Sequence, residues 1–266
     1  LIDGHSINEV HSGGISWQYD DLVVENIKRI EIIRGPGSAL YGQNAFLAVI
    51  NVITKDTDDI DGFQLTTGGG SFDTQNYNIL FGKEYKDLKM SGFFDYFDTE
   101  GFSKKIEQDL VFPASYSKSP GRSHNRKEKV DLNLKLSYRN LELNTKYMKK
   151  RRKDYIGIGH SLIDDTMIRS TYIFSELIYK WELGEKIESI TKLYYDQNNQ
   201  DSVFEQRPNN YVDIYGRTYP DGIKGRLPLK NRTIGFDNQF NYTVFKGNEA
   251  TFGFQYEWIR HHDVKY

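Results

Sequence analysis

Hydrophobic and polar residues alternate along much of the chain after about residue 62. From Val130 to Tyr138 the even positions are apolar or aromatic and the odd positions are polar, and the stretches 234–244 and 250–258 largely repeat this pattern. A period of two predicts β-strands with one apolar face and one polar face. About nine such strands are predicted, near residues 63–69, 75–84, 87–98, 128–138, 140–150, 170–183, 185–197, 231–245 and 248–260.

The connections between these strands alternate in length. Tight turns are predicted at residues 85–87, 139–140, 184–185 and 246–248, several of them with the Gly, Asn or Asp residues that hairpins favour. The other connections, near 99–127, 151–169 and 198–230, are long and polar. Short periplasmic turns alternating with long extracellular loops are typical of outer-membrane barrels, whereas a soluble sandwich has no reason to segregate its loops by length.

Strand length and aromatic placement support the same interpretation. Many of the predicted strands match the ~9–11 residues with which a tilted strand crosses a bilayer. Aromatic side chains gather near strand ends, as at 93–97, Tyr194, Tyr195 and Trp258, where they suit a membrane–water interface. The ordinary β-propensity of aromatic residues accounts for part of this pattern.

Composition narrows the class of protein further. The 266-residue chain carries a net charge of -2, which argues against a nucleic-acid binder. It contains no Cys, which excludes a disulfide scaffold, a thiolate metal site and a Cys nucleophile. No apolar run approaches the ~18 residues that a membrane helix needs. We expect the chain to be a fragment, because no export signal precedes Leu1 and single-chain bacterial barrels carry an even number of strands.

Residues 1–61 follow a different pattern. Two β-branched runs, 27–33 and 49–53, flank a Gly- and Pro-rich segment at 34–42. This order predicts a strand, a tight turn, a short helical turn and a second strand. Gly permits positive φ and Pro fixes φ, so both favour a sharp reversal. We therefore interpret one set of residues in this segment as structural: Gly35, Pro36, Gly37, Tyr41 and Gly42.

The block IKRIEIIRGPGSALYGQNAFLAVINVITK, residues 27–55, resembles the signature of the TonB-dependent receptor plug. Residues 1–8, LIDGHSIN, resemble an upstream plug segment of the same family. The resemblance implies an all-β membrane protein in which a small α+β plug precedes an antiparallel transmembrane barrel of ~22 strands. Residues 1–61 would then be the C-terminal part of the plug, and residues 62–266 the first part of the barrel.

The family resemblance implies a transporter and not an enzyme, with no cofactor and no metal site. Its partners would be the TonB–ExbB–ExbD complex, acting through a segment upstream of Leu1, and the lipid and lipopolysaccharide of a Gram-negative outer membrane. The expected form is a monomer that binds no nucleic acid. A ferric siderophore is the first candidate ligand, because iron chelates are the commonest cargo of the family; cobalamin, haem, nickel chelates and oligosaccharides stay open.

Two other classes are less consistent with the sequence. A passive porin would have no plug, which residues 1–61 contradict. An outer-membrane lipase or protease would need a Ser/His or Asp/His constellation, and no such spacing stands out among the six His residues.

The resemblance also suggests roles for particular residues of the plug. Arg29, Glu31 and Arg34 are candidates for ion pairs that hold the plug to the barrel wall, the alternative being solvated strand charges. Two loops would face outward beneath the binding cavity, and an ordinary surface loop is an equally good interpretation of each. Their candidate ligand-facing residues are His11, Ser12, Gln43 and Asn44.

Two further clusters lie in the barrel part. A basic run, Lys149–Lys153, would face lipopolysaccharide phosphates, attract an anionic ferric chelate or simply form the solvated base of a loop. The pair His261-His262 would suit haem or metal capture only with a third ligand, which the sequence does not identify.

Overall fold

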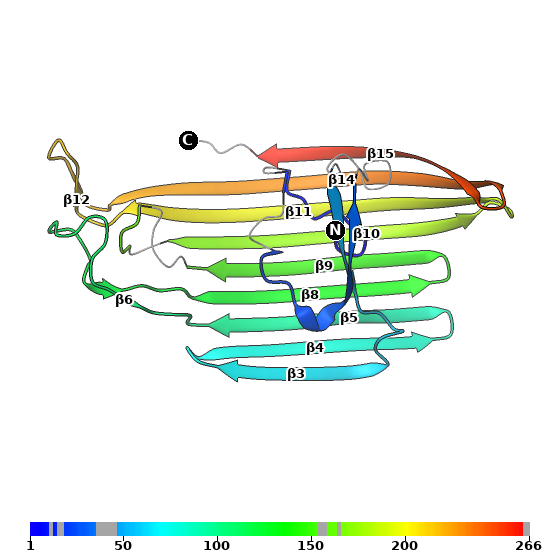
Figure 1. The fold of residues 1–266 in the computed structure, drawn as a ribbon, viewed down its shortest axis with the longest axis horizontal. Coiled ribbons are helices and arrows are strands. Elements are labelled where there is room, and N and C mark those ends of the chain that lie inside the picture. The colour runs from blue at the N-terminus through cyan, green and yellow to red at the C-terminus, as the bar shows by residue number, and fades with distance from the viewer. Residues whose placement is uncertain (11–12, 15–18, 36–46, 154–158, 164–165, 263–266) are drawn as a thin grey trace.

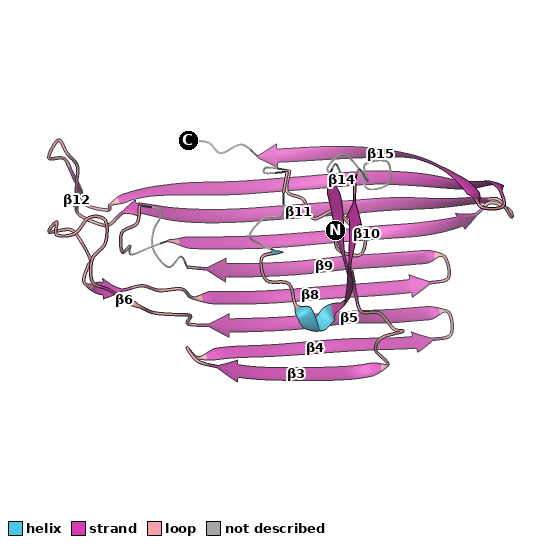
Figure 2. Ribbon diagram, viewed as in Figure 1, coloured by secondary structure: helices cyan, strands magenta, loops and turns pink. Residues whose placement is uncertain are grey.

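The computed structural model describes residues 1–10, 13–14, 19–35, 47–153, 159–163 and 166–262. Its regular structure is almost entirely antiparallel β-sheet (Figure 2). Nine strands form one large sheet in the order β15-β14-β11-β10-β9-β8-β5-β4-β3. These strands are β3 (Gly62–Gly70), β4 (Thr74–Tyr85), β5 (Leu88–Thr99), β8 (Lys127–Tyr138), β9 (Leu141–Arg152), β10 (Met167–Glu182), β11 (Ile187–Arg207), β14 (Ile223–Phe245) and β15 (Asn248–His262).

Each strand of the large sheet pairs with the next one along the chain, so the predicted set of nine antiparallel strands is confirmed. Figure 1 shows the four predicted tight turns at one end of the strands and the long connections at the other, where a short turn at residues 71–73 also joins β3 to β4. Each of the four tight turns holds a residue in the left-handed region: Lys86, Arg139, Gly184 and Gly247, with φ of 55°, 53°, 90° and 87°. Positive φ lets a short hairpin follow the right-handed twist of its strands.

The long connections contain more regular structure than the sequence predicts. The connection predicted at 198–230 shortens to 208–222, because β11 extends to Arg207 and β14 begins at Ile223. Residues 198–202 are all polar, so they show no alternation, but their backbones still pair with β14. Two small hairpins fold within the long connections: β6 (Lys105–Ile106) with β7 (Gly121–Arg122), and β12 (Tyr211–Val212) with β13 (Thr218–Tyr219).

The polar face of the large sheet is the covered one. On β8, Lys129, Asp131 and Asn133 are 6%, 2% and 2% exposed, whereas Leu132 on the opposite face is 37% exposed. A soluble domain shows the reverse, because water draws polar side chains outward. We call the covered polar face the inner face, and the opposite apolar face the outer face.

The outer face carries a continuous apolar band across the strands. One row of directly paired residues runs across β8, β9, β10, β11 and β14, with four leucines followed by a phenylalanine. A band of this kind is what lipid-facing strands present to acyl chains. The residues of this row are Leu136, Leu143, Leu177, Leu193 and Phe236.

We call residues 1–61 the N-terminal segment; its described parts lie across the middle of the inner face (Figure 1). The described part contains the 3-10 helix η2 (Val24–Asn26) and a two-stranded sheet of β1 (Ile27–Arg34) and β2 (Ala48–Thr54). The predicted helical turn after Gly35 lies outside the described residues. Within the described ranges, no helix is long and apolar enough to cross a membrane.

Two apolar clusters help to fix the N-terminal segment to the sheet. The larger one joins its residues to β9 and β10, and the smaller one joins it to β4 and β5. Between these clusters most contacts are polar, and they form the candidate site. The main members are Ile2, Ile7, Val52, Met148 and Phe174 in the larger cluster, and Val23, Ile60, Leu80 and Phe93 in the smaller.

Candidate functional site: the interface between the N-terminal segment and the large sheet

His5 occupies the centre of this interface and is 3% exposed. Its Nδ1 lies 3.3 Å from Oε1 of Glu176 on β10, and its Nε2 lies 2.8 Å from Oδ1 of Asp196 on β11. The ring stacks on Phe174 with centroids 4.3 Å apart. Burial alone would lower the pKa of His5, but the hydrogen bonds and charges of Asp196 and Glu176 outweigh it and raise the pKa to about 9. His5 is therefore an imidazolium that donates to both carboxylates.

A tight turn delivers His5 to this position. Asp3 and Gly4 have φ of 50° and 81°, and the backbones of Ile2 and His5 bond to each other at 3.0 and 2.9 Å. Positive φ at both central residues is the requirement of a type I′ turn, which Asp-Gly satisfies at low cost. The Asp-Gly pair therefore has a physical role, because it turns the chain so that His5 meets the sheet.

On the side of the large sheet, a glycine makes room for the aromatic ring that lies against His5. Tyr194 stands edge-on to His5, with ring centroids 5.5 Å apart. Its ring lies over Gly235, the cross-strand partner on β14, where a Cβ would sit only 2.0 Å from the Tyr194 ring. The Tyr194 hydroxyl donates to Glu257 on β15 at 2.6 Å. Gly235 is needed for Tyr194 to lie in this position.

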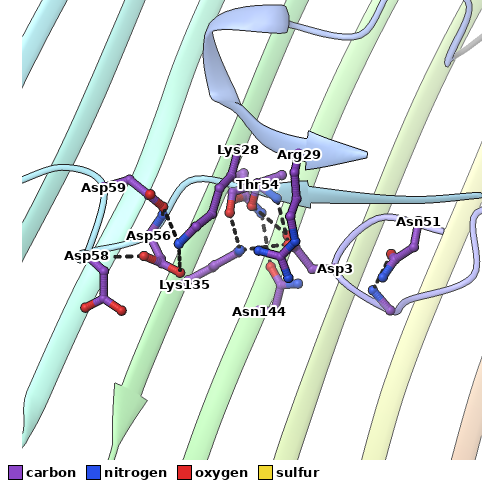
Figure 3. Close-up of polar contacts among 12 residues, drawn as sticks. Asp3, Lys28, Arg29, Asn51, Thr54, Asp56, Asp58, Asp59, Lys135 and Asn144 are labelled. Carbon is purple, nitrogen blue, oxygen red and sulfur yellow. Dashed lines mark hydrogen bonds and ion pairs between the residues drawn. The ribbon is translucent and has the colours of Figure 1, made fainter. Parts of the chain in front are cut away.

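Asp3 joins the turn before His5 to the end of β2 and also to β8 of the large sheet (Figure 3). Its carboxylate accepts hydrogen bonds from the backbone N and the Oγ1 of Thr54 at 2.9 and 2.7 Å. Lys135 on β8 forms an ion pair with Asp3 at 2.9 Å. The turn that places His5 is thus tied to the end of β2 and to the large sheet.

A second set of ion pairs lies nearer the long connections. Lys150 on β9 binds both Asp20 and Asp21, the latter at 2.9 Å. Arg152 pairs with Asp20 at 3.0 Å, and Lys127 pairs with Asp21. Partial burial would raise the pKa of Asp20, but the hydrogen bond from Lys150 and the nearby cations lower it. Two adjacent carboxylates of the N-terminal segment thus face three cations of β8 and β9.

Charged pairs also lie within the inner face itself. Lys146 on β9 pairs with Asp131 on β8, and both are almost fully buried. Lys129 lies 3.6 Å from Asp95 on β5 and donates to the backbone oxygen of Asp21 at 2.9 Å. Burying a charge is costly unless it is paired. These buried charges of the inner face are therefore neutralised by partners of opposite charge on neighbouring strands.

A small polar cavity of about 40 Å³ lies between residues 6–10 and the large sheet, beside Asp196 and Asn198. It has room for on the order of one or two water molecules. Glu9 accepts a hydrogen bond from Asn198 at 3.0 Å at its edge. This polar cavity interrupts the otherwise close contact between the described N-terminal segment and the sheet.

Two comparisons bear on the family. Residues 1–49 match the model of the TonB-dependent Receptor Plug Domain. The vitamin B12 transporter BtuB of Vibrio vulnificus (strain CMCP6) is 39% identical over 108 residues, which cover 40% of this chain and 17% of that protein. Residues 1–49 therefore belong to the plug domain family of TonB-dependent receptors.

Solved structures share the fold. The pyoverdine outer-membrane receptor FpvA of Pseudomonas aeruginosa PAO1 superposes with a TM-score of 0.60 and 12% identity, over 89% of this chain and 36% of that one. The ferric-catecholate import receptor Fiu of E. coli K12 gives a TM-score of 0.56 and 14% identity, over 90% of this chain and 40% of that one. The chain therefore spans well under half of the length of these relatives.

The plug match and the shared fold confirm the predicted fold class, and the family to which they point is one of transporters and receptors, not of enzymes. TonB-dependent receptors are outer-membrane proteins of Gram-negative bacteria, as predicted for this chain. In these terms the large sheet is a section of barrel wall whose outer face meets lipid, and its inner face meets the plug.

The structure places the predicted plug residues as follows. Arg29 and Glu31 lie on β1 and pair with each other, Arg29 Nη2 to Glu31 Oε1, at 2.7 Å. Arg34 ends β1 opposite Ala48 and is exposed. Gly35 has φ of 98°, which suits its predicted structural role. The other predicted turn residues and the ligand-facing ones lie outside the described residues: Pro36, Gly37, Tyr41, Gly42, His11, Ser12, Gln43 and Asn44.

Sequence reasoning did not single out the ionisable residues that join the plug to the described part of the wall: Asp3, His5, Glu9, Asp20 and Asp21. One signal was available, because the Asp-Gly pair between Ile2 and His5 predicts a tight turn that projects the next side chain. The wall partners of His5 were not predictable, since they lie 171 and 191 residues further along the chain.

Proposed function

We propose that this chain supplies the C-terminal part of the plug (residues 1–61) and the first strands of the barrel (residues 62–266) to a receptor that imports a scarce nutrient. The observation that best supports this proposal is the charged interface between plug and wall around His5 and Lys150. Ion pairs and hydrogen bonds can be replaced by water when the plug shifts, whereas separating an apolar interface exposes surface to water at a cost that grows with area. Such an interface suits a plug that must both seal and move.

The energy for this movement would come from the TonB–ExbB–ExbD complex, acting on a plug segment before Leu1. The ion pairs of the described interface would then be the contacts that force must break. Because the pairs form again when the plug returns, the wall would act as a template that guides resealing.

The predicted roles of Arg29, Glu31 and Arg34 belong to this proposal. β1 exposes Ile30 and Ile32 beside these charges. Relatives are much longer than this chain, so we propose that wall strands of the complete receptor cover this side of the plug and pair with the charges. The candidate ligand-facing residues His11, Ser12, Gln43 and Asn44 remain part of the same proposal.

The proposed cargo is a metal chelate, with a ferric siderophore as first candidate. The family base rate supports it, and the solved structures of similar fold include receptors described as ferric-catecholate and pyoverdine receptors. Cobalamin is the second candidate, favoured by the 39% identity to a vitamin B12 transporter.

Uptake assays decide between these cargoes. Cells that lack their own receptors would express the complete protein, with and without TonB, and would be given radio-iron siderophores or radiolabelled cobalamin. We expect uptake of one class, lost without TonB. Equal uptake in both strains would sink the proposed mechanism, and TonB-dependent uptake of cobalamin alone would replace the siderophore as cargo.

A further inference from the structure

The three long connections of the large sheet lie at the same end of the strands (Figure 1). The first, residues 100–126, contains the hairpin of β6 and β7, and the third, residues 208–222, contains the hairpin of β12 and β13. The second joins β9 to β10, and its residues 159–163 are among the described ones. We call residues 100–126, 159–163 and 208–222 the loop cap.

The first and second connections are joined by two hydrogen bonds. Asp109 accepts one from the backbone N of Leu162 at 2.8 Å, and the backbone N of Leu110 donates the other to the oxygen of His160 at 3.1 Å. Leu162 is 4% exposed, and a Cβ at Gly121 would lie 3.0 Å from its Cδ1. The other oxygen of the Asp109 carboxylate accepts two hydrogen bonds from its own connection, at 3.2 and 3.0 Å. One carboxylate therefore both orders the first connection and binds the second to it.

The second and third connections meet at Arg207, the last residue of β11. Its Nη1 donates to the backbone oxygen of Gly159 at 3.0 Å, and its guanidinium lies 5.6 Å from the centre of the Tyr211 ring. A cation over an aromatic ring is attracted to the face of that ring. A Cβ at Gly159 would lie only 2.0 Å from the backbone oxygen of Gln206, so a glycine permits this close approach. The Arg207 guanidinium thus contacts both connections.

The first and third connections meet through two tyrosines. The rings of Tyr116 and Tyr211 lie edge to face, with centroids 5.1 Å apart and planes at 76°. Tyr211 begins β12 and also lies beside Tyr219 of β13, with centroids 5.9 Å apart. Edge-to-face rings attract each other beyond the apolar surface that they bury. With this contact all three pairs of connections are joined, so displacing one connection breaks contacts with the other two.

We propose that the loop cap is one cooperative unit, in which the three connections become ordered and open together. Segments with few contacts open independently at a low free energy, whereas segments that are bonded to one another open as one unit. Coupling of this kind is reciprocal, so a molecule that binds to one connection restrains the other two as well. The inference rests on contacts within the loop cap and does not depend on the cargo of the receptor.

Hydrogen–deuterium exchange of the complete receptor, followed by mass spectrometry, tests this coupling. Asp109→Ala removes three hydrogen bonds, one of which joins the first connection to the second. We expect amide exchange to become about tenfold faster in residues 159–163 and 208–222 as well as in the first connection, because losing a hydrogen bond to a charged acceptor weakens the whole unit. Tyr211→Ala, in the third connection, should in turn speed exchange in residues 100–126.

The matched control is Asp213→Ala. This substitution also removes three hydrogen bonds, but all of them lie within residues 213–219, so exchange should change only there. Two results would overturn the proposal. One is faster exchange confined to the substituted connection in either Asp109→Ala or Tyr211→Ala, which would show that the connections open independently. The other is faster exchange of Asp109→Ala in strands β8 to β11 as well, because the loop cap would then not open separately from the wall.

Discussion

A single imidazolium is buried between two carboxylates where the plug meets the wall. His5 bonds to Glu176 and Asp196, which lie on adjacent strands of the large sheet. A buried charge with partners on both sides stabilises the contact only while it is charged. The strength of this contact therefore depends on the protonation of His5.

The raised pKa fixes the direction of that dependence. The pKa of His5 moves from 6.5 to about 9, so its contribution is fully present at a pH below 6.5 and is lost as the pH rises through about 9. The shift corresponds to roughly 3 kcal/mol. We expect the force that extracts the plug in single-molecule pulling of the complete receptor to fall over this range.

His5→Gln should weaken the plug contact and flatten its pH dependence. The same substitution at His124, an exposed residue in a long connection, is the matched control and should leave the profile unchanged. A His5→Gln receptor that retains the wild-type pH dependence would show that other groups set the strength of the contact.

At the scale of elements, a strand can be longer than the apolar face that it carries. β14 runs over Ile223–Phe245, but its regular apolar face begins only near Ile234. The remaining residues extend the strand beyond the apolar band, towards the long connections (Figure 1). Backbone pairing continues there because hydrogen bonding needs no apolar side chain, which explains why alternation underestimates this strand and β11.

The boundary of the apolar band can be tested on one strand. Leu177 and Thr171 both lie on the outer face of β10, Leu177 within the leucine row and Thr171 beside Lys149. Leu177→Arg should cost about 2–4 kcal/mol, and Thr171→Arg about 0–1 kcal/mol, because the cost of a charge falls towards the interface. Folded receptor in the outer membrane, measured by its heat-dependent gel mobility, should drop only for Leu177→Arg. Equal losses for both would place the band elsewhere.

At the scale of the whole molecule, plug and wall are matched in charge by region. Basic β8 and β9 meet Asp3, Asp20 and Asp21, while the acidic residues of β10 and β11 meet His5. Such a pattern fixes the orientation of the plug, because rotating it would bring like charges together.

Removing the carboxylates that face β9 should loosen the seal. In the complete receptor, Asp20→Asn with Asp21→Asn removes the two carboxylates that bind the buried Lys150, which weakens the contact between plug and wall. We expect cells carrying this variant to become several-fold more sensitive to a large hydrophilic antibiotic. The control, Asp58→Asn with Asp61→Asn, removes two exposed carboxylates that pair with Lys89 and Lys83 and should change nothing. Unchanged sensitivity of the first variant would mean that these ion pairs do not hold the seal.

The sequence by itself determined the nine strands of the large sheet, the four tight turns between them and the resemblance to the family. These features are local: a period of two, a turn residue with positive φ, and a contiguous signature over residues 27–55 can be read without knowing the path of the chain. Alternation alone leaves open which face is covered. Here the segregation of short and long connections decided for a barrel, and the buried Lys129 and Asp131 agree with it.

Only the tertiary structure decided which charges meet. The partners of His5 lie far along the chain, and the basic run separates into a plug-binding half and an outer half only when β9 is placed between two surfaces. Pairing across such distances depends on the strand order and on where the N-terminal segment crosses the inner face. Neither is encoded in the spacing of charged residues, because a charge in the sequence specifies its sign but not its neighbour.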